Sequence, residues 1–395
     1  MLKILQITPS YKPAYIYGGT TASVSKLCEE LVKSRLEIEV LTTNANGESV
    51  LQTPSNLPCH VDDVKTWYFK RLTKDHSHFS PALLWNLRKQ IKSHHKQHMI
   101  IHIHSWWNTV AIFSLILAIW YRIPVILSPR GMLTPYTLQN KRSLIKKLFH
   151  KVIGIWLLKQ CIIHATSEKE MEDLYKIQLR PKDIYIIPNF INCPSSLFHH
   201  DLTAKNPGIT TEKNAFRFLF LSRIEEKKGI DLLFKALSRT KFAWTLSIAG
   251  QGSPDYIWSL KNLSFHLNIH QHINWAGYLN QQEKFDFIQK HDLLVLPSQN
   301  ENFANVVIES LASGTPVLLT REVGLAAYVL QHDLGWICKS TITDLTHTLY
   351  KAYKDIHKRS EIRKYAPKQI LNDFSAPRLT ILYQDMYQQT LKNAN

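Results

Sequence analysis

The feature that most constrains the fold of this 395-residue chain is the alternation of short, continuous Val/Ile/Leu runs with helical patterns. Such runs are typical of parallel strands covered by helices on both faces, and their alternation with helices predicts a doubly wound α/β architecture. We expect strands over residues 3–8, 38–43, 100–104, 124–128, 161–166 and 184–188, and again over 216–221, 245–249, 273–276, 293–297 and 316–320.

The periodicity disappears between residues 190 and 216, in a stretch rich in Pro, Asn, Thr and Ser. A stretch of this composition indicates a linker, and the length of the chain suits two domains. We therefore expect a Rossmann-like domain over 1–195, a linker over 196–213 and a second Rossmann-like domain over 214–377. A helix over about 378–395 is expected to pack back on the first domain.

The formal net charge of +17 is concentrated in the first half of the chain, where residues 1–200 hold 25 Lys and Arg against 13 Asp and Glu. Two basic segments stand out, at 88–98 and 141–151. One interpretation is a pair of solvated helix faces. The other is a surface that meets anionic lipid headgroups. Nucleic acid is disfavoured, because the sequence contains no recognised nucleic-acid module.

Three local features bear on the cellular compartment. The N-terminal segment 1–11 is too short an apolar run for a signal peptide and reads as a first strand. The apolar stretch 110–127 is interrupted by Arg122 and Pro124, which leaves too few residues to span a bilayer. The five cysteines are scattered and form no CxxC pair, which suits a reducing compartment. We expect a cytoplasmic protein, and the lipid-binding interpretation of the basic segments would place it at the inner face of the cytoplasmic membrane.

The most informative segment covers 294–320 and reads as strand, loop, helix, turn and strand. Glu301 lies in the loop and Glu309 in the helix that follows. The helix begins between them, and its free backbone N–H groups and positive dipole end suit a phosphate. The two carboxylates can accept hydrogen bonds from sugar hydroxyls. The alternative is that Glu301 is an ordinary acidic residue at the N-terminus of the helix and that Glu309 faces solvent.

Two upstream segments add to this constellation. Arg223 follows a strand, and Lys227, Lys228 and Gly229 open a helix. Arg223 and one of these lysines could clamp a diphosphate without a metal, although solvated lysines in a turn would look the same. In SIAGQGSPD, at 247–255, a strand runs into Gly250, which we expect to approach the donor phosphate, although the short GxG pattern lacks the third glycine of a dinucleotide site.

The order Arg…Lys-Gly, Ala-Gly-x-Gly, Glu-x-Phe…Glu and Ser-Gly-Thr-Pro-Val resembles the donor domain of the retaining glycosyltransferase family 4. The resemblance implies a GT-B fold, with two Rossmann-like domains facing a central cleft. It implies that Arg223 and Lys228 bind the donor diphosphate, Glu309 the ribose and Glu301 the transferred sugar. Backbone near the sugar and phosphate would come from Phe303, Ala304 and Asn305, and Ala304 replaces a glycine that is common in the family.

The same resemblance assigns residues in the first half of the chain. Gly18 and Gly19 lie where a glycine turn approaches the donor phosphate, since backbone must come close to an anion there. His102 and His104 follow a strand, and we favour His104 for the sugar pocket because it is nearer the carboxyl end; a core histidine is the alternative. The segment 127–135 resembles that of bacterial surface-polysaccharide members, with Arg130 facing acceptor or donor phosphate. Asn189 is expected to be a structural anchor.

These implications define an enzyme that moves a hexose from a nucleotide-diphosphate sugar to a glycan acceptor, which we expect to be lipid-linked, in polysaccharide, exopolysaccharide or O-antigen-type biosynthesis. The resemblance implies retention of anomeric configuration. We see no DxD-like metal site, and we expect neither metal nor cofactor. A nucleotide-sugar epimerase of the same fold and a non-catalytic scaffold for a partner glycosyltransferase remain alternatives. A nicotinamide dehydrogenase is excluded by the missing GxGxxG motif. The sequence identifies neither nucleotide, sugar nor acceptor.

Overall fold

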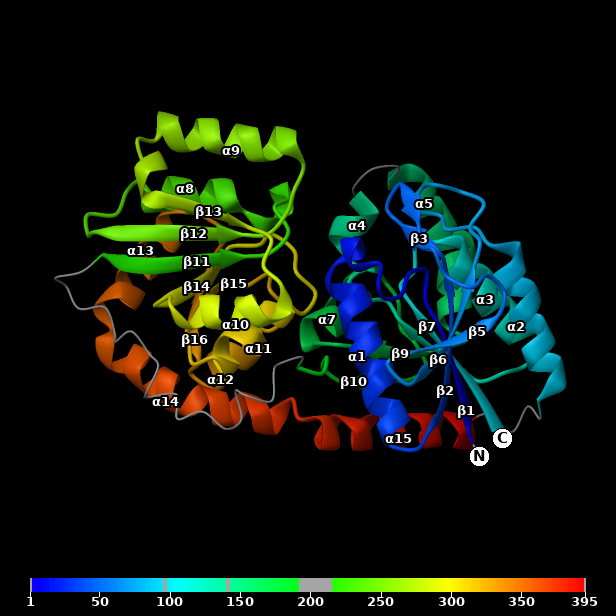
Figure 1. The fold of residues 1–395 in the computed structure, drawn as a ribbon. Coiled ribbons are helices and arrows are strands. Elements are labelled where there is room, and N and C mark those ends of the chain that lie inside the picture. Colours follow the sequence, from blue (N-terminus) through cyan, green and yellow to red (C-terminus); the bar gives the residue numbers. More distant parts are fainter. Residues whose placement is uncertain (1, 95–97, 140–142, 192–214, 394–395) are drawn as a thin grey trace. The chain divides into compact units, whose positions relative to one another are not determined.

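The computed structural model describes residues 2–94, 98–139, 143–191 and 215–393, and its contacts divide the chain into two compact units. Unit 1 comprises Met1–Phe190 with Ala376–Asn395, and unit 2 comprises Ile191–Ser375. Each unit is built on a largely parallel sheet flanked by helices (Figure 1). The expected linker, 196–213, and Cys193 lie outside the described residues.

The eight-stranded sheet of unit 1 has the order β10-β9-β8-β7-β1-β2-β6-β5. Its pairs are parallel except that of β5 with β6. The order reverses between β1 and β7, and loops at the carboxyl ends of such strands are where open α/β sheets bind ligands. The strands are β1 (Lys3–Ile7), β2 (Glu37–Thr43), β5 (Pro58–Val61), β6 (Val64–Phe69), β7 (Met99–His104), β8 (Val125–Ser128), β9 (Ile162–Ala165) and β10 (Ile184–Ile186), beside a small hairpin of β3 (Ala45–Asn46) and β4 (Ser49–Val50).

Helices cover both faces of this sheet, and each face has its own apolar core. The apolar stretch 110–127 forms α3 and β8, and no helix in the described part of the chain is long and apolar enough to cross a membrane. The C-terminal helix α15 packs Leu379, Tyr383, Met386 and Tyr387 into the core of unit 1. The helices are α1 (Gly19–Lys33), α2 (Pro81–Ser93), α3 (Thr109–Trp120), α4 (Pro135–Gln139), α5 (Ser143–Phe149), α6 (Ile155–Leu158), α7 (Glu168–Lys176) and α15 (Ala376–Lys392).

Unit 2 contains a six-stranded parallel sheet with the order β13-β12-β11-β14-β15-β16. Its order reverses between β11 and β14, so this pair is the switch point of the second sheet. The strands are β11 (Phe216–Leu221), β12 (Trp244–Ala249), β13 (Ile273–Gly277), β14 (Leu293–Leu296), β15 (Val317–Thr320) and β16 (Gly335–Cys338). The helices are α8 (Ile230–Leu237), α9 (Pro254–His266), α10 (Gln281–Gln289), α11 (Asn305–Ala312), α12 (Ala326–Gln331), α13 (Ile342–Lys354) and α14 (Ile356–Asp373).

All eleven expected strands are present, which confirms the doubly wound architecture. Five strands of the described residues were not expected: the two-residue β3 and β4, β5 with alternating exposed and partly buried side chains, β6 with buried and partly buried ones, and the four-residue β16. Continuous apolar runs mark strands buried on both faces, and these strands lack such a run.

Candidate functional site

The loops that leave β11 and β14 converge at the switch point of unit 2, and they carry Lys228 and Glu301. The ammonium group of Lys228 forms an ion pair with the Glu301 carboxylate. Lys228 is buried, and burial lowers the pKa of its amine while the Glu301 charge opposes that shift. Removal of one member of a buried pair leaves an uncompensated charge, so the two residues form one electrostatic unit.

The backbone of these two loops explains why they meet. Gly229 has a φ of +70°, and a Cβ at this position would lie 2.2 Å from the carbonyl oxygen of Pro297, which follows β14. Only glycine allows so close an approach in this conformation. The Gln299 N–H donates to the Lys227 carbonyl at 2.8 Å, which fixes the two loops to each other.

Arg223 lies in the same region, directly after β11. Its side chain is about half exposed and forms an ion pair with Glu225 at 2.8 Å. The loop after β12 packs against it, because a Cβ on Gly250 would lie 1.8 Å from the carbonyl oxygen of Ser222. The glycine is therefore required by the packing of two loops, and a direct contact between Gly250 and a donor phosphate stays a prediction.

The start of α11 supplies the third part of the site. Phe303 is buried, Ala304 has a left-handed backbone with φ +70°, and Asn305 is the first residue of the helix. Glu309 follows in the next turn, and its Oε1 accepts from the Lys284 amine of α10 at 2.6 Å. Both side chains are largely covered. This pair is not predictable from the sequence, because nothing in the local pattern links residues on two helices.

The backbone of Glu301 is fixed independently of its side chain. Its N–H donates to the Glu322 carbonyl at 3.1 Å, and its carbonyl accepts from the Gly324 N–H at 2.8 Å. These bonds anchor the loop after β14 to the loop after β15, so that the carboxylate is held toward Lys228. Arg223, Lys228, Glu301 and the start of α11 thus lie along the carboxyl edge of one sheet.

In unit 1, Gly18 ends the loop that follows β1, and Gly19 is the first residue of α1. Gly18 has a φ of +71° and precedes the first residue of the helix. A Cβ on Gly19 would meet nothing within 4 Å, so there is open space beside this residue. The first N–H groups of a helix lack intrahelical partners and suit an anion, as the sequence analysis expects.

His104 is the last residue of β7, and its ring is completely buried. Its Nε2 lies 2.8 Å from the Oε1 of Gln6 on β1. Burial lowers the pKa of His104 well below its ordinary value, and the nearby His102, Arg130 and His164 add to the effect. The imidazole is therefore neutral at physiological pH. A contact between His104 and a sugar stays a prediction.

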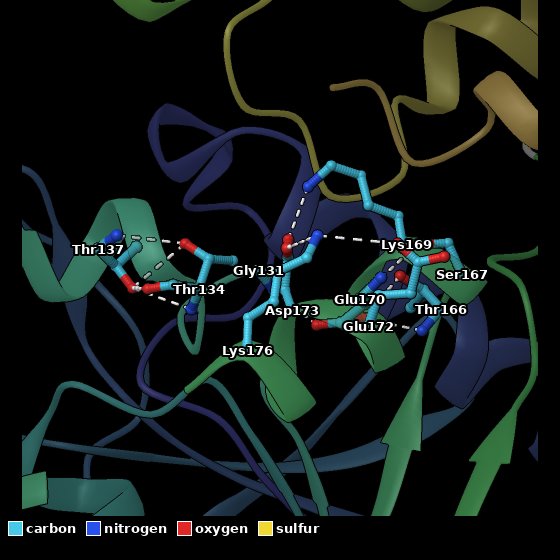
Figure 2. A network of polar contacts seen from close by, with 10 residues as sticks. All are labelled: Gly131, Thr134, Thr137, Thr166, Ser167, Lys169, Glu170, Glu172, Asp173 and Lys176. Atoms are coloured by element: carbon cyan, nitrogen blue, oxygen red, sulfur yellow. Dashed lines mark hydrogen bonds and ion pairs between the residues drawn. The ribbon is translucent and has the colours of Figure 1, made fainter. Parts of the chain in front are cut away.

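Arg130 is also buried, with a φ of +55°, and its Nη1 donates to Oδ1 of Asn189. The structure thus joins two residues that the sequence analysis placed in separate roles. Figure 2 shows how the adjoining loop is fixed: the Gly131 N–H donates to Glu170 at 2.7 Å. The other oxygen of Glu170 accepts from the Thr166 N–H at 2.8 Å. The role of Arg130 toward acceptor or donor phosphate stays a prediction.

Over the described ranges, no group of three or more His, Cys, Asp or Glu is placed to bind a metal ion. Four cationic side chains lie at this edge of unit 2: Arg223, Lys227, Lys228 and Lys284.

Two family models match the chain, one in each half. The Glycosyltransferase Family 4 model matches residues 17–194, and the Glycosyl transferases group 1 model matches residues 204–369. The chain is 22% identical over 387 residues to an uncharacterized glycosyltransferase of Methanocaldococcus jannaschii, with 95% of both chains covered.

Solved structures show the same fold. The sucrose-phosphate synthase of Thermosynechococcus elongatus superposes with a TM-score of 0.74 at 16% identity, over 99% of this chain and 100% of that one. Anabaena HepE in complex with UDP-glucose superposes with a TM-score of 0.71 at 17% identity, over 98% and 100%. Each unit of the chain is accordingly a Rossmann-like domain of the GT-B fold.

Proposed function

This chain is a glycosyltransferase that belongs to group 1 and family 4, and we propose that it moves a hexose from a nucleotide-diphosphate sugar to a lipid-linked glycan acceptor. The observation that carries the proposal is the Lys228–Glu301 pair at the switch point of unit 2, beside the start of α11. A cation, a carboxylate and a helix N-terminus are the groups that a sugar diphosphate requires. Polysaccharide, exopolysaccharide or O-antigen assembly is the process we assign to it.

In the proposed reaction, Arg223 and Lys228 neutralise the charge that develops on the leaving diphosphate. Preorganised cations stabilise such charge without the reorganisation that water requires. Glu309 accepts from the ribose hydroxyls and Glu301 from the transferred sugar, while backbone at Phe303, Ala304 and Asn305 lies beside sugar and phosphate. The departing phosphate takes the proton of the acceptor hydroxyl on the same face of the sugar. The anomeric configuration is thereby retained, and no metal ion is used.

A binding screen tests the proposal. The full chain is titrated with UDP, GDP, UDP-glucose, UDP-galactose and GDP-mannose by thermal shift and calorimetry. We expect stabilisation by one nucleotide family, lost in Arg223→Ala and Glu309→Ala and kept in the control variants Arg239→Ala and Glu361→Ala, whose residues lie outside the site. A folded protein that binds none of these ligands would contradict the proposal and favour a scaffold. Consumption of a donor without an acceptor would favour an epimerase.

We further propose that unit 1 meets an anionic membrane through the helical segment formed by α5, residues 150–154 and α6. Exposed apolar side chains recur every fourth residue along it: Leu144 (81% exposed), Leu148 (67%), Val152 (65%) and Trp156 (57%). Lys147 and Lys151 are exposed beside them. An apolar stripe flanked by lysines is typical of helices that lie in a membrane interface. The acceptor would then be reached from the inner face of the cytoplasmic membrane.

Vesicle sedimentation tests the membrane proposal. The full chain should sediment with vesicles of phosphatidylcholine and phosphatidylglycerol and be released by salt, which screens the lysines. We expect Leu148→Ser with Trp156→Ser to abolish sedimentation. The matched control, Trp258→Ser with Leu330→Ser, removes equally exposed apolar side chains from unit 2 and should sediment normally. Equal binding to neutral vesicles, or no binding, would contradict it.

A further inference from the structure

Seven groups form one continuous chain of hydrogen bonds inside unit 1, from the backbone after β10 to the end of β7. Successive contacts are Ile187 O to His164 Nε2 (2.8 Å), His164 Nδ1 to Ser128 Oγ (2.6 Å), Ser128 Oγ to His102 Nε2 (2.7 Å), His102 Nδ1 to Tyr387 Oη (2.9 Å), Tyr387 Oη to Gln6 Nε2 (3.1 Å) and Gln6 Oε1 to His104 Nε2 (2.8 Å). The chain thus links four strands and the C-terminal helix α15.

The proton positions in the first half of this network follow from its fixed end. The Ile187 carbonyl can only accept, so His164 carries its proton on Nε2 and offers Nδ1 as an acceptor. The Ser128 hydroxyl therefore donates to His164, and its oxygen accepts from His102 Nε2. A neutral imidazole has one proton, so the Nδ1 of His102 must also be an acceptor.

In the second half of the network, the same order of donors and acceptors continues to His104. The Tyr387 hydroxyl donates to His102 Nδ1, so its oxygen accepts from the amide nitrogen of Gln6. This orientation places the Gln6 carbonyl oxygen against His104, whose Nε2 must donate. His104 Nδ1 is then left without a proton, and it has no hydrogen-bond partner in the part of the chain that the structure describes.

We infer that Tyr387 is a positioning residue that holds His104 in its Nε2-protonated tautomer, so that a ligand reaching His104 meets an acceptor at Nδ1. The inference rests on the proposed function, in which His104 contacts the donor sugar. A buried acceptor without a partner is unfavourable, and a sugar hydroxyl that donates to Nδ1 would satisfy it. The C-terminal helix α15, although distant in sequence from β7, would thereby determine that Nδ1 of His104 accepts a hydrogen bond and does not donate one.

Nitrogen NMR of the histidine rings tests the tautomer without any ligand. In the full chain labelled with ¹⁵N-histidine, two-bond correlations report which nitrogen carries the proton, and a His104→Asn spectrum assigns the resonance. We expect only the Nε2-protonated form in the wild type. In Tyr387→Phe the Gln6 amide has no partner to fix its orientation, so both tautomers of His104 should appear.

The matched control is Tyr383→Phe, which removes a hydroxyl from the same helix. Tyr383 Oη lies 3.2 Å from His164 Nε2 but is not in the path to His104, so the tautomer should not change. Ser128→Ala interrupts the path at another point and should also give both tautomers of His104. It keeps the inference testable if Tyr387→Phe fails to fold. An Nδ1 proton in the wild type, or an unchanged tautomer in both path variants, would overturn the inference.

Donor affinity gives the second readout, with UDP-glucose or GDP-mannose as the titrant, whichever the screen shows to bind. We expect the Kd to rise about fivefold to tenfold in Tyr387→Phe, the effect of one lost hydrogen bond, and to stay unchanged in Tyr383→Phe. Altered tautomers with unchanged donor affinity would overturn the positioning role. Donor binding at Arg223 and Glu309 would in that case still support the proposed function.

Discussion

Ala304, at the start of α11, has a left-handed backbone with a φ of +70°. This conformation is unfavourable for any residue with a Cβ, and the family resemblance places a glycine here. We predict that Ala304→Gly stabilises the protein by about 0.5–1 kcal/mol. Glycine relieves the backbone strain of the folded state, and its greater conformational entropy in the unfolded chain offsets part of this gain. Urea unfolding of the full chain measures the change.

The control for this substitution is Ala352→Gly in the interior of α13, where the backbone is helical and the same exchange should destabilise by about 1 kcal/mol or more. Donor affinity should change little in Ala304→Gly, since the backbone N–H groups remain. A loss of stability at position 304 equal to that at 352 would show that the left-handed conformation costs nothing.

At the same scale, sequence patterns located the charged residues of the site but not their partners. Lys228 and Glu301 are recognisable because each belongs to a local motif. The contacts of Glu309 with Lys284 and of Arg130 with Asn189 join residues 25 and 59 positions apart, on elements whose packing no local pattern specifies. The burial of His104 and Arg130 is likewise a result of tertiary packing.

The C-terminal helix α15 completes the core of unit 1, and its stability contribution can be tested by one side chain. Met386 is fully buried, whereas Ile381 on the other side of the helix is 57% exposed. We predict that Met386→Ala lowers the free energy of unfolding by about 2–5 kcal/mol, the cost of a core truncation. Ile381→Ala should change it by about 0.5 kcal/mol or less.

Chemical unfolding followed by tryptophan fluorescence would measure both variants. Equal effects of the two substitutions would contradict the packing of α15 described above, because only Met386 reaches the core.

Strands were predictable from short apolar stretches, whether or not both faces are buried. β14 is fully buried and was expected from its composition, and β10 and β13 were expected although they are only partly buried. β16 is short and contains Gly335, where a Cβ would lie 2.1 Å from the Val317 carbonyl oxygen. Glycine at this position allows β16 to approach β15 closely, but in the sequence pattern a glycine argues against a strand.

For the whole molecule, we predict a loss of stability as the pH falls from about 6.5 toward 5. Burial lowers the pKa of His102 and His104 well below the ordinary value, and lowers that of His164 to about 3. Their unfolded pKa is about 6.5, so in this window the unfolded chain binds protons that the folded chain excludes. The free energy of unfolding should fall by about 1.4 kcal/mol per pH unit for each such histidine once the unfolded ring is protonated.

Urea unfolding between pH 7 and pH 5 measures this dependence. His78, His150 and His291 shift in the same direction, again because they are buried. His104→Asn removes one titrating group and should reduce the slope by the contribution of one histidine. A free energy of unfolding that does not change over this range would contradict the burial of neutral rings.

Hydrogen–deuterium exchange of the full chain with and without its donor nucleotide sugar tests the location of the donor site most directly. We predict slower exchange in peptides that cover 223–230 and 303–309, with unchanged exchange in α9, which lies outside the site. Slower exchange confined to other segments, with both of these peptides unaffected under saturating donor, would contradict the assignment of Arg223, Lys228, Glu301 and Glu309 to donor binding.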